Sequence, residues 1–197
     1  QGRGVPYDYN AKEKRSGFQI VYQTLHGGGK FDESNYKSAG GLHGVGASVT
    51  NALSVWMEVH SFRDSVDHFA RFEKGGSKFS GIKDLGKTTK RGTNVRFLPD
   101  PTIFDDVTFS FDRIAQHLDD QACLTKGVTF HLLDERTGRK QEFYYENGLL
   151  EYYNRHTTGK LPLTKPRHFE GTDNGIKVEV VFGFLKDNYD EKIISFA

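Results

Sequence analysis

Glycines cluster directly before a run of small and apolar residues in the stretch GGLHGVGAS, residues 40–48. The first amide N–H groups of a helix lack intrahelical partners and carry partial positive charge, so they can bind an anion. Glycines just before the helix let the main chain approach that anion and adopt positive φ angles. A helix is expected from about Val45 to Leu53, with Val45, Val49 and Leu53 on one face. The stretch therefore predicts a phosphate site at the start of a helix.

The spacing of these glycines excludes two common phosphate-binding folds. No Gly-Lys-Ser or Gly-Lys-Thr ends the loop, so it is not a Walker A motif. It is not the GxGxxG of a dinucleotide-binding fold either, because the spacing is reversed and a polar segment stands where a buried strand should be. A glycine linker that merely leads into a core helix remains the alternative interpretation.

Side chains near this stretch have the chemistry of a nucleotide site. Lys30 and Lys37 lie in the polar, glycine-rich segment 26–41, where mobile ammonium groups could close over a polyphosphate. Tyr36, in the same segment, could pack on a base or a ribose. Each of these residues also has an ordinary interpretation as a solvated lysine or a packed loop tyrosine. His43 is better placed to offer its backbone N–H than to act as an acid or base.

Two further side chains, distant in sequence, fit the same chemistry. Arg3 stands in the Gly- and Pro-punctuated stretch GRGVP and could border a base pocket. Thr93 begins a strand, where its hydroxyl could reach a purine through water, although threonine is common in strands for its β-propensity alone.

The elements expected around these residues indicate an α+β fold. Helical spacing favours helices over 17–25, 110–124 and 148–156, the second with Ser110 as its N-cap. Residues 55–73 and 128–146 each indicate a β-hairpin, and 93–99 and 176–184 indicate single strands. Residues 157–175 are expected to be a linker. This order is not a series of βαβ units, so a mixed or antiparallel sheet is predicted.

Composition limits the classes of protein that the chain can represent. With 27 basic and 26 acidic residues its net charge of +1 gives no overall electrostatic signature for nucleic acid. A single cysteine excludes an internal disulfide framework and indicates a reducing compartment. No run approaches 18 consecutive apolar residues and no signal peptide is recognisable, so we expect no membrane contact and a cytoplasmic location.

Four stretches together resemble a known family. GRGVP, LHGGGKF, YKSAGGLHGVGASVTNALS and RGTNVRFLPD are similar, in order and separation, to the N-terminal ATPase region of the B subunits of bacterial type II DNA topoisomerases. This group, gyrase and topoisomerase IV, belongs to the GHKL superfamily. FEGTDNGIKVEV is similar to the entry to its transducer domain. The other GHKL proteins, such as mismatch-repair ATPases, share the glycine pattern but not the residues that surround it.

The resemblance implies a fold and a division of the chain. The implied fold is the Bergerat two-layer sandwich, a mixed sheet with helices on one face. Residues 1–160 would form the ATP-binding domain, without its N-terminal part, and residues 161–197 a linker and the first strand of the transducer. The chain is thus expected to be truncated at both ends.

The resemblance also implies site residues. Backbone N–H groups of the glycine loop would hold the triphosphate, Lys30 would contact its terminal phosphate, and Tyr36 would contact adenine. Arg3, Pro6 and Arg63 would border the pocket mouth, where the aminocoumarin inhibitors of the family bind. The implied ATP-binding set is Gly4, Lys30, Tyr36, Lys37, Gly41, Leu42, His43, Gly44, Val45, Gly46 and Thr93.

Parts of the family's catalytic site lie outside the sequence. The general-base glutamate, the asparagine that binds Mg2+ and the aspartate that accepts the adenine amino group would all precede Gln1. No catalytic residue and no metal ligand is therefore assigned within the chain. This stretch alone is expected not to turn over ATP.

The implied function is ATP-driven change of DNA topology. ATP, with Mg2+, would drive dimerisation of two B subunits around double-stranded DNA, and the partner A subunit would cleave the DNA, so no tyrosine of this chain is assigned that role. FEKGG, PDPTIF and YYENG favour topoisomerase IV, with the gyrase B subunit as the alternative. A non-catalytic interaction module with a glycine linker is the alternative from another class.

Overall fold

The computed structural model describes residues 2–27, 44–186 and 191–195, and the chain divides into two compact units. The first unit is Gln1–Thr108 and the second is Phe109–Ala197. This division reflects where contacts within the chain are dense, and it falls elsewhere than the domain boundary predicted at 160/161. That boundary concerns the identity of the domains and stays a prediction.

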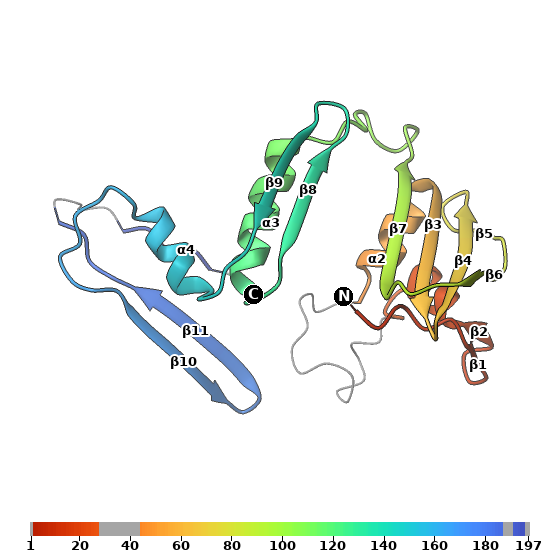
Figure 1. Cartoon of the computed structure of the whole chain (residues 1–197), viewed down its shortest axis with the longest axis horizontal. Coiled ribbons are helices and arrows are strands. Elements are labelled where there is room, and N and C mark those ends of the chain that lie inside the picture. Colours follow the sequence, from red (N-terminus) through yellow and green to blue (C-terminus); the bar gives the residue numbers. More distant parts are fainter. Residues whose placement is uncertain (1, 28–43, 187–190, 196–197) are drawn as a thin grey trace. The chain divides into compact units, whose positions relative to one another are not determined.

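The first unit is built on an antiparallel sheet with two helices (Figure 1). Strand β3 is central and pairs with β4 on one side and β7 on the other, while β4 also pairs with β5 and β6. In chain order the elements are β1 (Tyr9–Asn10), β2 (Arg15–Ser16), α1 (Gly17–Gln23), α2 (Gly46–Ala52), β3 (Ser54–Arg63), β4 (Val66–Glu73), β5 (Lys78–Phe79), β6 (Lys83–Lys87) and β7 (Gly92–Pro99). The predicted hairpin over 55–73 is confirmed as β3 and β4.

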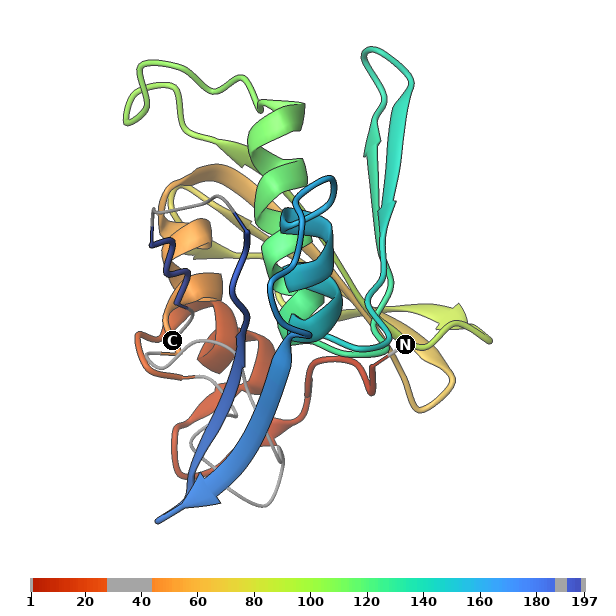
Figure 2. The same ribbon diagram turned by 90° about the vertical axis from the view of Figure 1, so that its left-hand side faces the viewer.

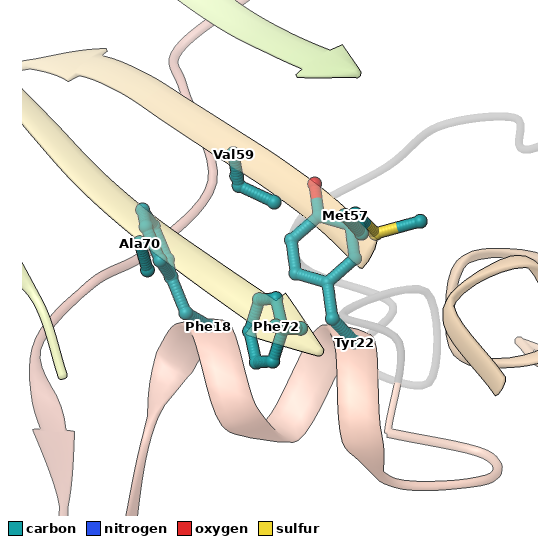
Figure 3. Close-up of a cluster of buried hydrophobic side chains, with 6 residues drawn as sticks. All are labelled: Phe18, Tyr22, Met57, Val59, Ala70 and Phe72. Carbon is teal, nitrogen blue, oxygen red and sulfur yellow. The ribbon is translucent and has the colours of Figure 1, made fainter. Parts of the chain in front are cut away.

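Helix α1 packs its aromatic side chains against one face of this sheet (Figure 3). Phe18 and Tyr22, four residues apart on α1, contact the inward residues of β3 and β4. Those inward residues are Met57, Val59, Ala70 and Phe72, each at most 1% exposed. Because helices cover this face and strands pair antiparallel, the predicted α+β class is confirmed.

Helix α1 starts with a capping box and ends earlier than predicted. The Ser16 hydroxyl accepts a hydrogen bond from the Gln19 N–H, and the Gln19 side chain bonds back to the Ser16 N–H. The helix was expected to continue to Leu25, but it ends at Gln23 because Thr24 adopts an extended backbone. Leu25 is consequently 62% exposed rather than part of the apolar face.

The second unit contains two helices and two separate antiparallel hairpins. Its elements are α3 (Phe111–Leu124), β8 (Phe130–Asp134), β9 (Arg139–Phe143), α4 (Leu149–His156), β10 (Arg167–Asp173) and β11 (Ile176–Phe182). Ser110 is the N-cap of α3, as predicted, and accepts a bond from the Arg113 N–H. Figure 2 shows α4 beside α3, and a core of Ala122, Cys123, Phe143, Tyr145 and Tyr152 forms between these helices and β9.

The linker predicted over 157–175 is partly wrong, because residues 167–173 form strand β10. They pair with β11 through the two-residue turn Asn174–Gly175. Both turn residues have positive φ angles, +49° and +80°, which is the conformation that an Asn-Gly hairpin turn requires. The expected single strand is therefore one half of a hairpin.

Candidate functional site

The structure describes eight of the predicted site residues, and all of them lie in the first unit: Arg3, Gly4, Pro6, Gly44, Val45, Gly46, Arg63 and Thr93. The other six, Lys30, Tyr36, Lys37, Gly41, Leu42 and His43, lie outside the described residues. Their predicted roles stay predictions.

Segment 2–7 lies against the ends of β3 and β7, and Gly4 fits there because it has no side chain. Its φ angle is +82°, in the region that favours glycine. A Cβ at this position would lie 2.7 Å from Ser61 Oγ, 3.2 Å from the Gly92 carbonyl oxygen and 3.3 Å from Arg63 Cβ. Gly4 thus brings the main chain of segment 2–7 next to both strands.

Both backbone polar groups of Val5 are bonded to hydroxyl side chains. Its N–H donates to Thr93 Oγ1 at 3.1 Å, and its carbonyl accepts from Ser61 Oγ at 2.7 Å. Ser61 and Thr93 are cross-strand partners on β3 and β7. The structure therefore joins the predicted Thr93 to the GRGVP stretch directly.

Of the residues predicted at the pocket mouth, Arg3 and Pro6 lie in segment 2–7, and Arg63 lies at the end of β3 beside Gly4. Pro6 packs on the start of α1, where a Cβ on Gly17 would overlap the Pro6 carbonyl. Arg63 is half-buried and its Nε lies 3.7 Å from the Asp64 carboxylate, while Arg3 is exposed. The structure brings Arg63 and Thr93 to the Gly4–Val5 part of the segment, while their predicted roles toward a ligand stay predictions.

Tyr7 fixes the far end of segment 2–7. Its ring stacks on His68 with 3.6 Å between centroids and 19° between planes, and its hydroxyl donates to Asp64 at 3.3 Å. Desolvation raises the pKa of the Tyr7 phenol, and the Asp64 carboxylate raises it further by a smaller amount. His68 is 3% exposed, and its Nδ1 lies 2.6 Å from Asp84 Oδ1.

Helix α2 begins at Gly46, within one residue of the predicted start. Gly44 has a φ angle of +60°, and Val45 is the N-cap without a side-chain hydrogen bond to the helix. The Ser48 hydroxyl donates to the Val45 carbonyl, so it does not cap the first amides. Gly46 is exposed, and a Cβ there would meet nothing within 4 Å. Among residues 2–27 and 44–186, none would contact a methyl group added at the first residue of α2.

Sequence reasoning missed Ser61, Tyr7 and His68. A serine in a strand, or a tyrosine after a proline, carries no signal of the contact it makes with residues more than fifty positions away. The register of β3 with β7 aligns Ser61 with Thr93, and its register with β4 aligns Ser61 with His68, so the sheet brings Ser61 and His68 to segment 2–7.

Among the described residues, a groove and a cluster of possible metal ligands also resemble binding sites. A groove of about 540 Å³ runs between α1, α2 and the turn at 75–77, and its polar lining includes Arg15, Gln19 and Gln23. In the second unit His168, Glu170 and Glu179 gather their ligand atoms within 4.8 Å. The last cluster is an ion-pair network rather than a metal centre, because Lys126 binds Glu179 at 2.8 Å and Lys177 pairs with Glu170.

Comparison with solved structures gives the class of the fold. No protein-family model matches the chain. The crystal structure of the 43K ATPase domain of Thermus thermophilus gyrase B in complex with an aminocoumarin matches with a TM-score of 0.76 and 29% identity. The match covers 93% of this chain and 46% of that one. The fold is therefore that of the GHKL-type ATPase domain found in the B subunits of type II topoisomerases.

Comparison with curated proteins is more specific. The chain is 45% identical to the B subunit of DNA topoisomerase 4 from Enterococcus faecalis, 42% to that from Streptococcus pneumoniae and 41% to that from Bacillus subtilis. Each match covers all of this chain, which spans 29–30% of the length of those relatives. The chain is thus a homologue of the topoisomerase IV B subunits, as the sequence resemblance predicted. Within the part of the chain that the structure describes, no helix is both long and apolar enough to cross a membrane.

Proposed function

We propose that this chain is the ATP-binding part of the B subunit of a type II DNA topoisomerase, in which ATP binding and hydrolysis drive DNA strand passage. The observation that carries the proposal is the 41–45% identity to topoisomerase IV B subunits over the whole chain. The geometry supports the proposal, because two features lie in one compact unit. These are the start of α2, which has no side-chain cap, and segment 2–7, whose Val5 N–H bonds the Thr93 hydroxyl.

The residues are assigned as follows. The amides of Gly44, Val45 and Gly46, with those of Gly41, Leu42 and His43, hold the triphosphate at the start of α2. Gly4 and Thr93 border the base, and Arg3, Pro6 and Arg63 border the pocket mouth. Lys30, Tyr36 and Lys37 belong to the closing segment. Mg2+ balances the charge of the bound triphosphate through ligands that we assign to no residue of this chain.

The proposal extends to partners. Two B subunits dimerise when ATP binds, an A subunit cleaves the DNA, and double-stranded DNA passes between them in the cytoplasm. Topoisomerase IV-like decatenation and relaxation are favoured over gyrase-like negative supercoiling, because the curated relatives named above are topoisomerase IV subunits. Assays with linked and with relaxed DNA circles, using the full-length protein and its A subunit, separate the two activities.

A titration of the full-length protein with a non-hydrolysable ATP analogue tests the nucleotide site. Gly46→Ala should weaken binding at least tenfold, because the methyl group fills the space beside the α2 amides without straining the helix. Gly171→Ala, which also adds a methyl group in open space but in β10, is the control and should bind normally. Wild-type protein without saturable binding would instead favour a non-catalytic interaction module.

A further inference from the structure

We infer that Ser61 is a positioning residue of the nucleotide pocket, and that it acts by holding the Val5 carbonyl so that segment 2–7 stays in place as a pocket wall. The inference rests on the function proposed above. Ser61 itself is fully buried, at 0% exposure, so it acts through Val5 rather than on a ligand.

Segment 2–7 cannot be held by an ordinary strand ladder. Pro6 has no N–H to donate, and Gly4 has the positive φ angle that interrupts a strand. Val5 is the residue between them. Its carbonyl and its N–H are bonded to Ser61 and Thr93, at 2.7 and 3.1 Å.

The hydroxyls of Ser61 and Thr93 act on Val5 together. Ser61 and Thr93 are directly paired across β3 and β7. This pair of strands therefore bonds both the carbonyl and the N–H of Val5. Thr93 is exposed, whereas Ser61 lies beneath segment 2–7 on the fully buried side. Loss of the Ser61 hydroxyl would leave the Val5 carbonyl without this bond. The N–H···Thr93 bond and the packing of the Val5 side chain on the core would remain.

Gly4 lies next to the same hydroxyl. A Cβ on Gly4 would lie 2.7 Å from Ser61 Oγ and 3.3 Å from Arg63 Cβ, so Gly4 lies directly beside Ser61 and Arg63 on β3. Three residues after Gly4, the Tyr7–His68 stack anchors the segment to β4 through a separate contact. Removal of the Ser61 bond should therefore loosen residues 2–6 without releasing the whole segment from the sheet.

Strand β3 offers a matched control in Ser54. It is 2% exposed, and its hydroxyl also donates to a backbone carbonyl, that of Thr50, at 2.6 Å. Ser54 lies at the opposite end of β3 from Ser61 and bonds to helix α2. Ser61→Ala and Ser54→Ala therefore remove the same kind of buried hydrogen bond, and only the first removes it from segment 2–7.

The test compares these variants in the full-length protein by two readouts. Hydrogen exchange, measured by mass spectrometry without nucleotide, should be about five- to tenfold faster over residues 2–7 in Ser61→Ala, and unchanged there in Ser54→Ala. The KM for ATP should rise about five- to tenfold in Ser61→Ala while kcat stays within twofold, because the pocket wall moves and the chemistry does not. Ser61→Cys keeps the volume with a weaker donor and should fall between wild type and Ser61→Ala.

Each outcome decides the inference. Unchanged exchange over residues 2–7 in Ser61→Ala would overturn it, and so would faster exchange with an unchanged KM, which leaves the proposed function intact. An equal rise in KM in Ser54→Ala would also overturn it, since the effect would then be general loss of stability. Wild-type protein that binds no nucleotide would overturn the proposed function and this inference together, whatever the exchange data show.

Discussion

At the scale of single residues, Gly4 is a position where the backbone conformation leaves little room for a side chain. Gly4→Ala would strain a φ angle of +82° and bring a methyl group 2.7 Å from Ser61 Oγ. We expect a loss of roughly 1–3 kcal/mol in the free energy of unfolding, together with weaker nucleotide binding. Gly2→Ala is the control, because a Cβ there would meet nothing within 4 Å. Denaturant unfolding measures the stability of both variants. Equal stability of Gly4→Ala and Gly2→Ala would contradict the close contact between Gly4 and Ser61.

Cys123 is a second residue whose surroundings predict its chemistry. It is 1% exposed in the core of the second unit, and desolvation, followed by the nearby Asp120 and Asp119 carboxylates, raises the pKa of its thiol to about 12. Since the thiolate is the reactive form, native protein at pH 8 should react with iodoacetamide at least a hundredfold more slowly than a free thiol. Mass spectrometry should show full modification only after denaturation. Rapid modification of native protein would contradict this burial.

At the scale of elements, the capping box of α1 offers a prediction with an internal control. Ser16→Ala removes the hydroxyl that accepts the Gln19 N–H and should cost about 1 kcal/mol of stability. Thr50→Ala removes a hydroxyl that donates to the carbonyl of Gly46 within α2, and should change stability by less than about 0.5 kcal/mol. Urea unfolding compares them, and an equal cost for both would mean that the box contributes nothing specific.

The elements also show what sequence could predict. The β3–β4 hairpin and helix α3 follow from local signals, which are alternation along the strands and Ser110 before a helical stripe. Strand β10 was missed because its residues, RHFEGTD, do not alternate regularly in polarity. Its partner β11 and the Asn174–Gly175 turn make it a strand, and that turn was the available signal.

The candidate site also combines features that could be predicted from the sequence with features that could not. The start of α2 could be predicted, because glycines followed by helical spacing are a local pattern. Thr93 was predicted from its type and the resemblance, and the structure adds that it bonds Val5. Ser61 could not be predicted, because its role depends on the register between β3 and β7 and on a segment 56 residues away.

At the scale of the whole molecule, buried phenols and the buried thiol predict how stability depends on pH. Burial raises the pKa of Tyr22, in the core of the first unit, from 10.0 to about 12, and Tyr145 and Tyr152 in the second unit also have raised pKa values. Each of these groups keeps its proton longer when folded than when unfolded. Between the unfolded and folded pKa values the unfolded state therefore binds fewer protons, and stability falls as pH rises.

The stabilising contribution of Tyr22 should thus be complete below about pH 10 and should disappear as pH rises towards 12. At 1.36 kcal/mol for each pKa unit, its loss amounts to roughly 3 kcal/mol. Tyr22→Phe keeps the ring between Phe18 and Phe72 but cannot ionise, so its free energy of unfolding should decline less steeply with pH. Urea unfolding at pH 8 to 11.5 measures both slopes. Parallel slopes for wild type and Tyr22→Phe would show that the phenol reaches solvent, and the packing of α1 on the sheet would then be looser than this core implies.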